Sequence, residues 1–101
     1  MRTSEEILER IYRKKSDIVT RQIVGQVILV PIRGKVADMQ RIFMLNAVGD
    51  FIWQQLTGES PVASICSRVE ENFTVAADQA RGDVCEFIGR LIEQELITEV
   101  C

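Results

Sequence analysis

Histidine is absent from this sequence, and no apolar run approaches the length of a membrane span. Histidine is the commonest general base and metal ligand, and the acidic residues here are scattered rather than paired. We therefore expect no catalytic residue, no metal and no cofactor. The charged first segment, MRTSEEILERIYRKK, is typical of neither a secretory signal nor a membrane anchor. These absences predict a non-enzymatic protein of the cytoplasm.

Cysteines are few and irregularly spaced. Cys66, Cys85 and Cys101 match no zinc or redox motif, and an odd number of cysteines without histidine indicates reduced thiols. Cys66 lies on an apolar stripe and is expected to be a packed core thiol. Cys85 stands beside another such stripe and Cys101 is terminal, and the sequence leaves the reactivity of these two thiols open.

The net charge of -3 is unevenly distributed over the 101 residues. Residues 1–41 carry nine basic and five acidic side chains, whereas residues 42–101 carry three basic and ten acidic ones. The hydrophobic fraction of 47% is that of an ordinary globular protein. We expect one folded domain whose second half is a poor ligand for phosphates, with no nucleic-acid or membrane partner.

The first half of the chain predicts a short helix followed by strands. An amphipathic helix is expected over residues 4–13, within an N-terminal arm of residues 1–16. The β-branched residues on both sides of Gly25 predict a hairpin, with Pro31 at an edge, a bulge or a strand end. A third short strand is expected over residues 41–45, which gives an antiparallel meander with unpaired edges.

The second half predicts three helices. Asn46 is expected to cap the first helix, which Gly58 would end. Ser60 and Pro61 are expected to start the second helix, and the third runs over residues 76–95. Their apolar stripes are Val48, Phe51, Ile52 and Leu56; Val62, Ile65, Cys66, Val69 and Phe73; and Ala80, Val84, Phe87, Ile88 and Leu91.

Three strands followed by three helices indicate an α+β, winged-helix-like domain: a small three-stranded antiparallel sheet, a three-helix bundle and an extra N-terminal helix. Trp53 adjoins the first apolar stripe and is expected to be packed. The last helix has two basic and five acidic residues, which disfavours DNA binding. An open strand edge beside that helix can instead accept an extended peptide as one more strand. A winged-helix transcriptional regulator, a protein-interaction module and a homodimer formed through sheet edges are the alternatives.

The run MLNAVGDFIWQQLTGESPVASICSRVEENFTV, continued by DVCEFIGRLIEQELI, resembles the PqqD family. Its members are named for pyrroloquinoline quinone biosynthesis and share a domain that recognises the leaders of ribosomally made peptides. The resemblance covers roughly residues 17–98 and assigns residues 17–101 to a PqqD-like domain. The matching positions are Leu45 and Asn46 after a strand, Gly49, Ile52, Trp53, Leu56 and Gly58, the SPVASI helix, and Asp83, Val84, Phe87, Ile88 and Leu91.

The resemblance implies that a precursor's leader lies as an added strand between the third strand and the third helix. The precursor would then pass to a modifying enzyme, commonly a radical S-adenosylmethionine protein in this family. The domain itself would bind no cofactor. By position, the resemblance places backbone contacts at Arg41, Ile42, Phe43 and Met44, and side-chain contacts at Arg81, Val84, Cys85 and Ile88.

Overall fold

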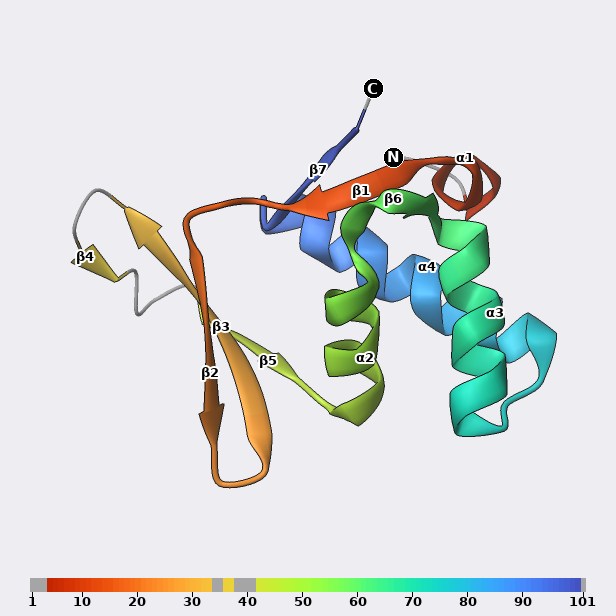
Figure 1. Ribbon diagram of the computed structural model, residues 1–101, viewed down its shortest axis with the longest axis horizontal. Helices are drawn as coiled ribbons and strands as arrows, with labels where there is room; N and C mark the ends of the chain where they lie inside the picture. Colours follow the sequence, from red (N-terminus) through yellow and green to blue (C-terminus); the bar gives the residue numbers. More distant parts are fainter. Residues whose placement is uncertain (1–3, 34–35, 38–41, 101) are drawn as a thin grey trace.

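The computed structural model describes residues 4–33, 36–37 and 42–100. In this part of the chain, a sheet built on a long hairpin lies along one side of the helices (Figure 1). A second sheet lies across one end of the helices, beside α1 (Figure 1). The predicted α+β class is confirmed. The elements are α1 (Ser4–Glu9), β1 (Ile11–Lys14), β2 (Ile18–Ile23), β3 (Gln26–Arg33), β4 (Val36–Ala37), β5 (Phe43–Leu45), α2 (Ala47–Gln55), β6 (Thr57–Pro61), α3 (Val62–Phe73), α4 (Ala77–Glu93) and β7 (Ile97–Glu99).

The predicted hairpin is β2 and β3, which pair antiparallel from Ile18 opposite Pro31 to the turn. Its two turn residues, Val24 and Gly25, both have positive φ, +40° and +78°. Two central residues with positive φ form the tight hairpin turn that matches the twist of the strands. β5 pairs antiparallel with the other edge of β3, with Leu29 opposite Phe43. The expected meander of three strands is therefore confirmed, and the short β4 adds to the end of β3.

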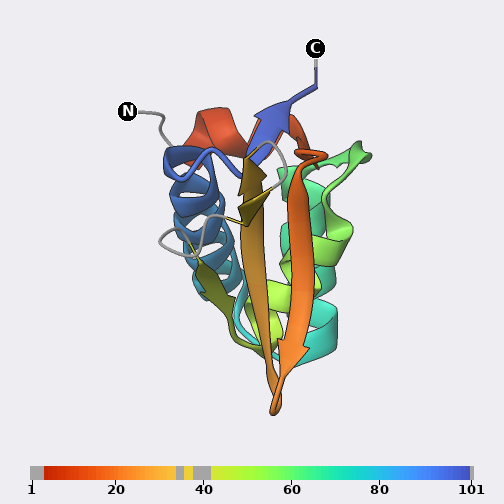
Figure 2. The ribbon, with the colours of Figure 1, turned by 90° about the vertical axis from the view of Figure 1, so that its left-hand side faces the viewer.

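The hairpin sheet covers the helices with its inner face (Figure 2). Successive side chains of a strand point to opposite faces, and β5 shows this alternation. Leu29 and Leu45 are buried in the core, whereas Met44, between Phe43 and Leu45 in β5, is 60% exposed. The sheet therefore has an apolar inner face toward the helices and an outer face that also carries exposed apolar side chains.

A second sheet, in the order β6-β1-β7, was not predicted. The N-terminal helix expected over residues 4–13 ends at Glu9, and Ile11–Lys14 forms the central strand of this sheet instead. A helix of six residues is marginal, whereas a central strand pairs on both sides. The ion pair between Arg10 Nη1 and Glu99 Oε2, at 2.6 Å, joins the two ends of the chain. The predicted arm of residues 1–16 thus contains a strand that pairs with residues 57–61 and 97–99.

Two helix ends also differ from the prediction. α2 ends at Gln55, and Gly58 has a φ of +85° within β6 rather than at the helix end. Ser60 belongs to β6, and its hydroxyl accepts a hydrogen bond from Arg68 Nη2 at 3.1 Å. Pro61, the residue before α3, takes the N-cap position without a side-chain cap. The chain forms a strand here because residues 57–61 pair with β1.

The three apolar stripes of the helices meet in one core, as predicted. Trp53 is only 3% exposed, and Lys14 Nζ of β1 lies 5.5 Å from the centre of its ring. The tryptophan is therefore packed, and its ring meets β1 of the second sheet. Cys66 is buried too, and burial, assisted by the nearby Cys85 thiol, raises its pKa to about 11. This thiol is protonated near neutral pH and is a core residue, as predicted.

Candidate functional site

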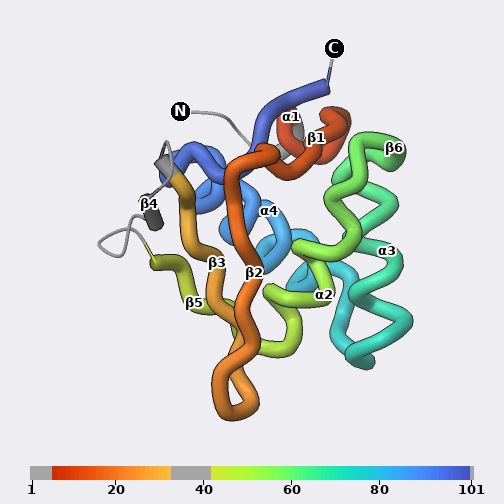
Figure 3. The backbone as a smooth tube through the Cα atoms, turned by 60° about the vertical axis from the view of Figure 1, so that its left-hand side comes forward, coloured from red at the N-terminus to blue at the C-terminus, as the bar shows by residue number. Residues whose placement is uncertain are grey.

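β5 has one edge that no described strand pairs with. Its other edge is bonded to β3, and the strand lies at the side of the hairpin sheet next to α4 (Figures 2 and 3). An unpaired edge exposes a row of backbone amide and carbonyl groups to any extended segment that approaches it. We call this feature the outer edge of β5.

Two aromatic rings join β5 to α4. Phe43 of β5 and Phe87 of α4 meet edge to face, with ring centres 6.0 Å apart and an angle of 67° between the rings. The guanidinium carbon of Arg90 lies 5.4 Å from the centre of the Phe43 ring. Edge-to-face rings and a cation over a ring face are both favourable arrangements. These contacts hold the strand and the helix at a fixed separation.

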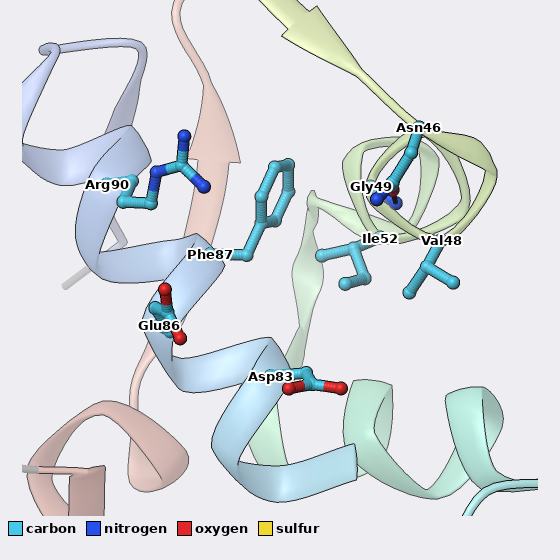
Figure 4. A pocket seen from close by; sticks show the side chains of 8 residues that line it. All are labelled: Asn46, Val48, Gly49, Ile52, Asp83, Glu86, Phe87 and Arg90. Carbon is cyan, nitrogen blue, oxygen red and sulfur yellow. Dashed lines mark hydrogen bonds between the residues drawn. The ribbon is translucent and has the colours of Figure 1, made fainter. Parts of the chain in front are cut away.

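A pocket of about 310 Å³ opens beside these rings, between the start of α2 and α4 (Figure 4). We call it the α2–α4 pocket. Phe87 reaches from α4 toward α2, with Arg90 and Asp83 on either side of it (Figure 4). The lining consists of Asn46, Val48, Gly49 and Ile52 from the α2 side and Asp83, Glu86, Phe87 and Arg90 from α4.

The corner between β5 and α2 builds one wall of this pocket. Asn46 follows β5 directly, and its side-chain Oδ1 accepts a hydrogen bond from the Gly49 amide at 2.7 Å, which confirms the predicted cap. A Cβ at Gly49 would lie 3.2 Å from Asn46 Oδ1 and 3.3 Å from the Phe87 ring. A glycine at this position lets the first turn of α2 approach the Phe87 ring closely.

The predicted contact residues fall into three groups. Arg41 lies outside the described residues. Ile42, Phe43 and Met44 lie at or next to β5, and Ile42 and Met44 are exposed. The four helix residues do not line the α2–α4 pocket: Val84, Cys85 and Ile88 are buried in the core, and Arg81 is exposed, with its charge acting on Cys66 of α3.

The face of α4 that lines the pocket lies one residue away from the predicted one. Asp83, Phe87 and Arg90 recur at positions i, i+4 and i+7, which places them on one side of the helix. This set runs along the border of the buried stripe of Val84, Ile88 and Leu91. The sequence contains the signal for this face. Each of the three residues directly precedes a residue of the apolar stripe, and successive residues of a helix are rotated by about 100°.

The described residues contain no group of three or more histidine, cysteine or acidic side chains placed to hold a metal ion. Within the same part of the chain, no helix has both the length and the apolar character needed to span a membrane.

A family model for coenzyme PQQ synthesis protein D (PqqD) matches residues 25–97. The chain belongs to the PqqD family. The matched segment contains the whole of β5, the α2–α4 pocket and the last helix, so both features of the site lie within the PqqD part of the chain. The resemblance seen in the sequence is confirmed.

Two solved structures share this PqqD-family fold. One is TbiB1 in complex with the TbiA(beta) leader peptide, with a TM-score of 0.67 and 22% identity; the match covers 84% of this chain and 93% of that one. The other is a lasso peptide synthetase B1 complexed with its leader peptide, with a TM-score of 0.69 and 18% identity over 86% and 96% of the two chains. No curated protein sequence gives a significant match.

Proposed function

We propose that this protein binds the leader of a ribosomally made precursor peptide along the outer edge of β5 and presents the peptide to a modifying enzyme. The observation that carries the proposal is the edge of β5 that no described strand pairs with, beside the α2–α4 pocket, in a chain of the PqqD family. The two similar structures, which are complexes with leader peptides, support it.

Strand addition explains how so small a site holds a peptide. An added strand forms backbone hydrogen bonds to β5, and these bonds are independent of the peptide's sequence. Alternate side chains of the peptide point toward α4, where Phe87 and the α2–α4 pocket lie, and they supply the specificity. The peptide therefore needs no deep cavity, and the protein needs no change of fold.

The contacts that we propose on the strand side are those of the resemblance: Arg41, Ile42, Phe43 and Met44. On the helix side we propose the pocket-lining residues in place of buried ones. A peptide at the surface reaches Phe87, whereas it reaches Val84, Cys85 and Ile88 only if the core opens. The helix contacts are thus Asp83, Glu86, Phe87 and Arg90.

The protein in this proposal is a non-catalytic partner. The chemistry belongs to a second protein, which we propose is a radical S-adenosylmethionine enzyme or another peptide-modifying enzyme. Precursor peptides of this kind are made by ribosomes, so we place the encounter in the cytoplasm.

Calorimetric titration with a synthetic leader tests the proposal. The peptide is the leader encoded by the short reading frame nearest this gene. We expect Phe87→Ala to weaken binding by about tenfold or more, because the ring forms the junction of the β5 edge and the pocket. The matched control is Phe73→Ala, which removes a half-buried ring from another edge-to-face pair, with Phe51 on α2.

Circular dichroism establishes that both variants are folded. The proposed site is supported if Phe73→Ala leaves the affinity within about twofold of the wild type and Phe87→Ala weakens it by about tenfold or more. Equal affinities for all three proteins, or equal losses in the two variants, would place the peptide elsewhere.

A further inference from the structure

We infer that the leader recognised by this protein carries a lysine or arginine two residues from an apolar anchor, on the same face of the peptide strand. The inference rests on the proposed function and adds the charge and spacing of the ligand.

The first observation is the charge of the pocket wall. Asp83 and Glu86 line the α2–α4 pocket, and both are exposed. Neither carboxylate has an ion-pair partner among the residues that the structure describes. The one basic residue of the lining, Arg90, lies over the Phe43 ring on the other side of Phe87 from Asp83 (Figure 4). The wall of the pocket is therefore negative on the Asp83 side of Phe87, away from Arg90 (Figure 4).

The second observation is the apolar surface next to these acids. Phe87, Val48 and the buried Ile52 line the same pocket. A lysine or arginine side chain can lay its aliphatic stem on such a surface and carry its charge to the rim. An acidic side chain at this position would be repelled by two carboxylates. The pocket therefore favours a long basic side chain above other polar occupants.

The third observation is a match of two repeat distances. Asp83 and Phe87 are four residues apart on α4, which corresponds to about 6 Å along the helix axis. Side chains two residues apart on a strand point to the same face and are separated by about 6.6 Å. A peptide strand alongside α4 can therefore place an apolar side chain against Phe87 and the next side chain of that face against Asp83.

Selection from a displayed library of random 12-residue peptides tests this inference, whichever precursor the protein serves. The library is selected on the wild-type protein, on Asp83→Asn/Glu86→Gln, and on the control Asp78→Asn/Glu71→Gln. The control removes two exposed acids, from α4 and α3, that do not line the pocket. Both variants therefore have the same change in net charge.

We expect the wild type and the control to enrich peptides in which a lysine or arginine stands two positions from an apolar residue. The Asp83→Asn/Glu86→Gln variant should retain the apolar preference and lose the basic one. Replacing the selected basic residue by glutamine should weaken binding to the wild type by about threefold to tenfold and leave binding to this variant within about twofold.

The outcomes separate the inference from the proposed function. Apolar peptides without a basic residue, or a basic preference that persists in Asp83→Asn/Glu86→Gln, would overturn the inference while strand addition stands. If the control variant loses the basic preference equally, the preference comes from the net charge of the protein, and the inference is overturned as well. The absence of any enrichment on the wild type would overturn the proposed function, and the inference with it.

Discussion

Replacing Asn46 by alanine removes the hydrogen bond that starts α2. Asn46 Oδ1 accepts from the Gly49 amide at 2.7 Å, and Gly49 is buried. Loss of an N-cap side chain costs about 1 kcal/mol of folding free energy, within a range of roughly 0.5–2. A buried amide without an acceptor costs about 1–3 kcal/mol, but the adjoining pocket lets water reach this one. We therefore expect Asn46→Ala to lower the free energy of unfolding by about 1 kcal/mol.

Urea denaturation followed by circular dichroism measures this change. For a domain of this size, 1 kcal/mol corresponds to a decrease in Tm of about 4–8 °C. The matched control is Asn46→Asp, which retains an acceptor oxygen and places a negative charge at the helix N-terminus. We expect it to stay within about 0.5 kcal/mol of the wild type. A loss below about 0.3 kcal/mol in Asn46→Ala, or equal losses in both variants, would refute the role of the cap.

Three further predictions concern the helices and the core. Gly82→Ala and Gly89→Ala should each stabilise the protein by about 0.5–1 kcal/mol, since both glycines lie inside α4 and an added Cβ meets nothing within 4 Å; a lower urea midpoint would contradict this. Trp53→Ala should cost about 3–5 kcal/mol, and an unchanged Tm would show that the ring is not packed. The Cys66 pKa of about 11 exceeds that of an unfolded thiol. The protonated thiol therefore contributes fully to the stability of the fold below about pH 9, and this contribution is lost as the pH rises through 11. Between pH 8 and pH 10.5, urea denaturation should therefore show a larger decrease in the free energy of unfolding for the wild type than for Cys66→Ala. Equal decreases would contradict this prediction.

Local patterns predicted the parts of the fold that local interactions determine. The cap at Asn46 and the apolar stripe of α3 were correct because a cap and a helical face depend on residues within one or two turns. The hairpin was predicted without a strong turn pair, since β-branched residues on both sides of Gly25 favour strands.

The second sheet could not be predicted because its partners are distant in the sequence. The Arg10–Glu99 ion pair joins residues 89 positions apart. Residues 57–61, TGESP, include glycine and proline, which are depleted in strands, yet they form β6 beside β1. Residues 11–14 can equally continue an amphipathic helix, and only their pairing with β6 and β7 decides between the two.

The structure brings together the two elements on which the site was predicted, but it buries most of the side chains named on the last helix. The resemblance indicated the third strand and the third helix, and the structure brings β5 and α4 together through Phe43 and Phe87. Three of the four side chains named on the helix, Val84, Cys85 and Ile88, are in the core. The resemblance assigned these contacts by position, whereas the apolar stripe of the helix already indicated that Val84 and Ile88 are core residues.

The most direct test of strand addition is the hydrogen exchange of the β5 backbone. ¹⁵N-labelled protein is titrated with the synthetic leader, and amide shifts and exchange rates are followed by NMR. We expect residues 42–45 and 83–90 to show the largest shifts, and amides on the outer edge of β5 to become protected when the leader is bound. Shifts confined to the β6-β1-β7 sheet or to α3, with exchange in residues 42–45 unchanged, would contradict this expectation.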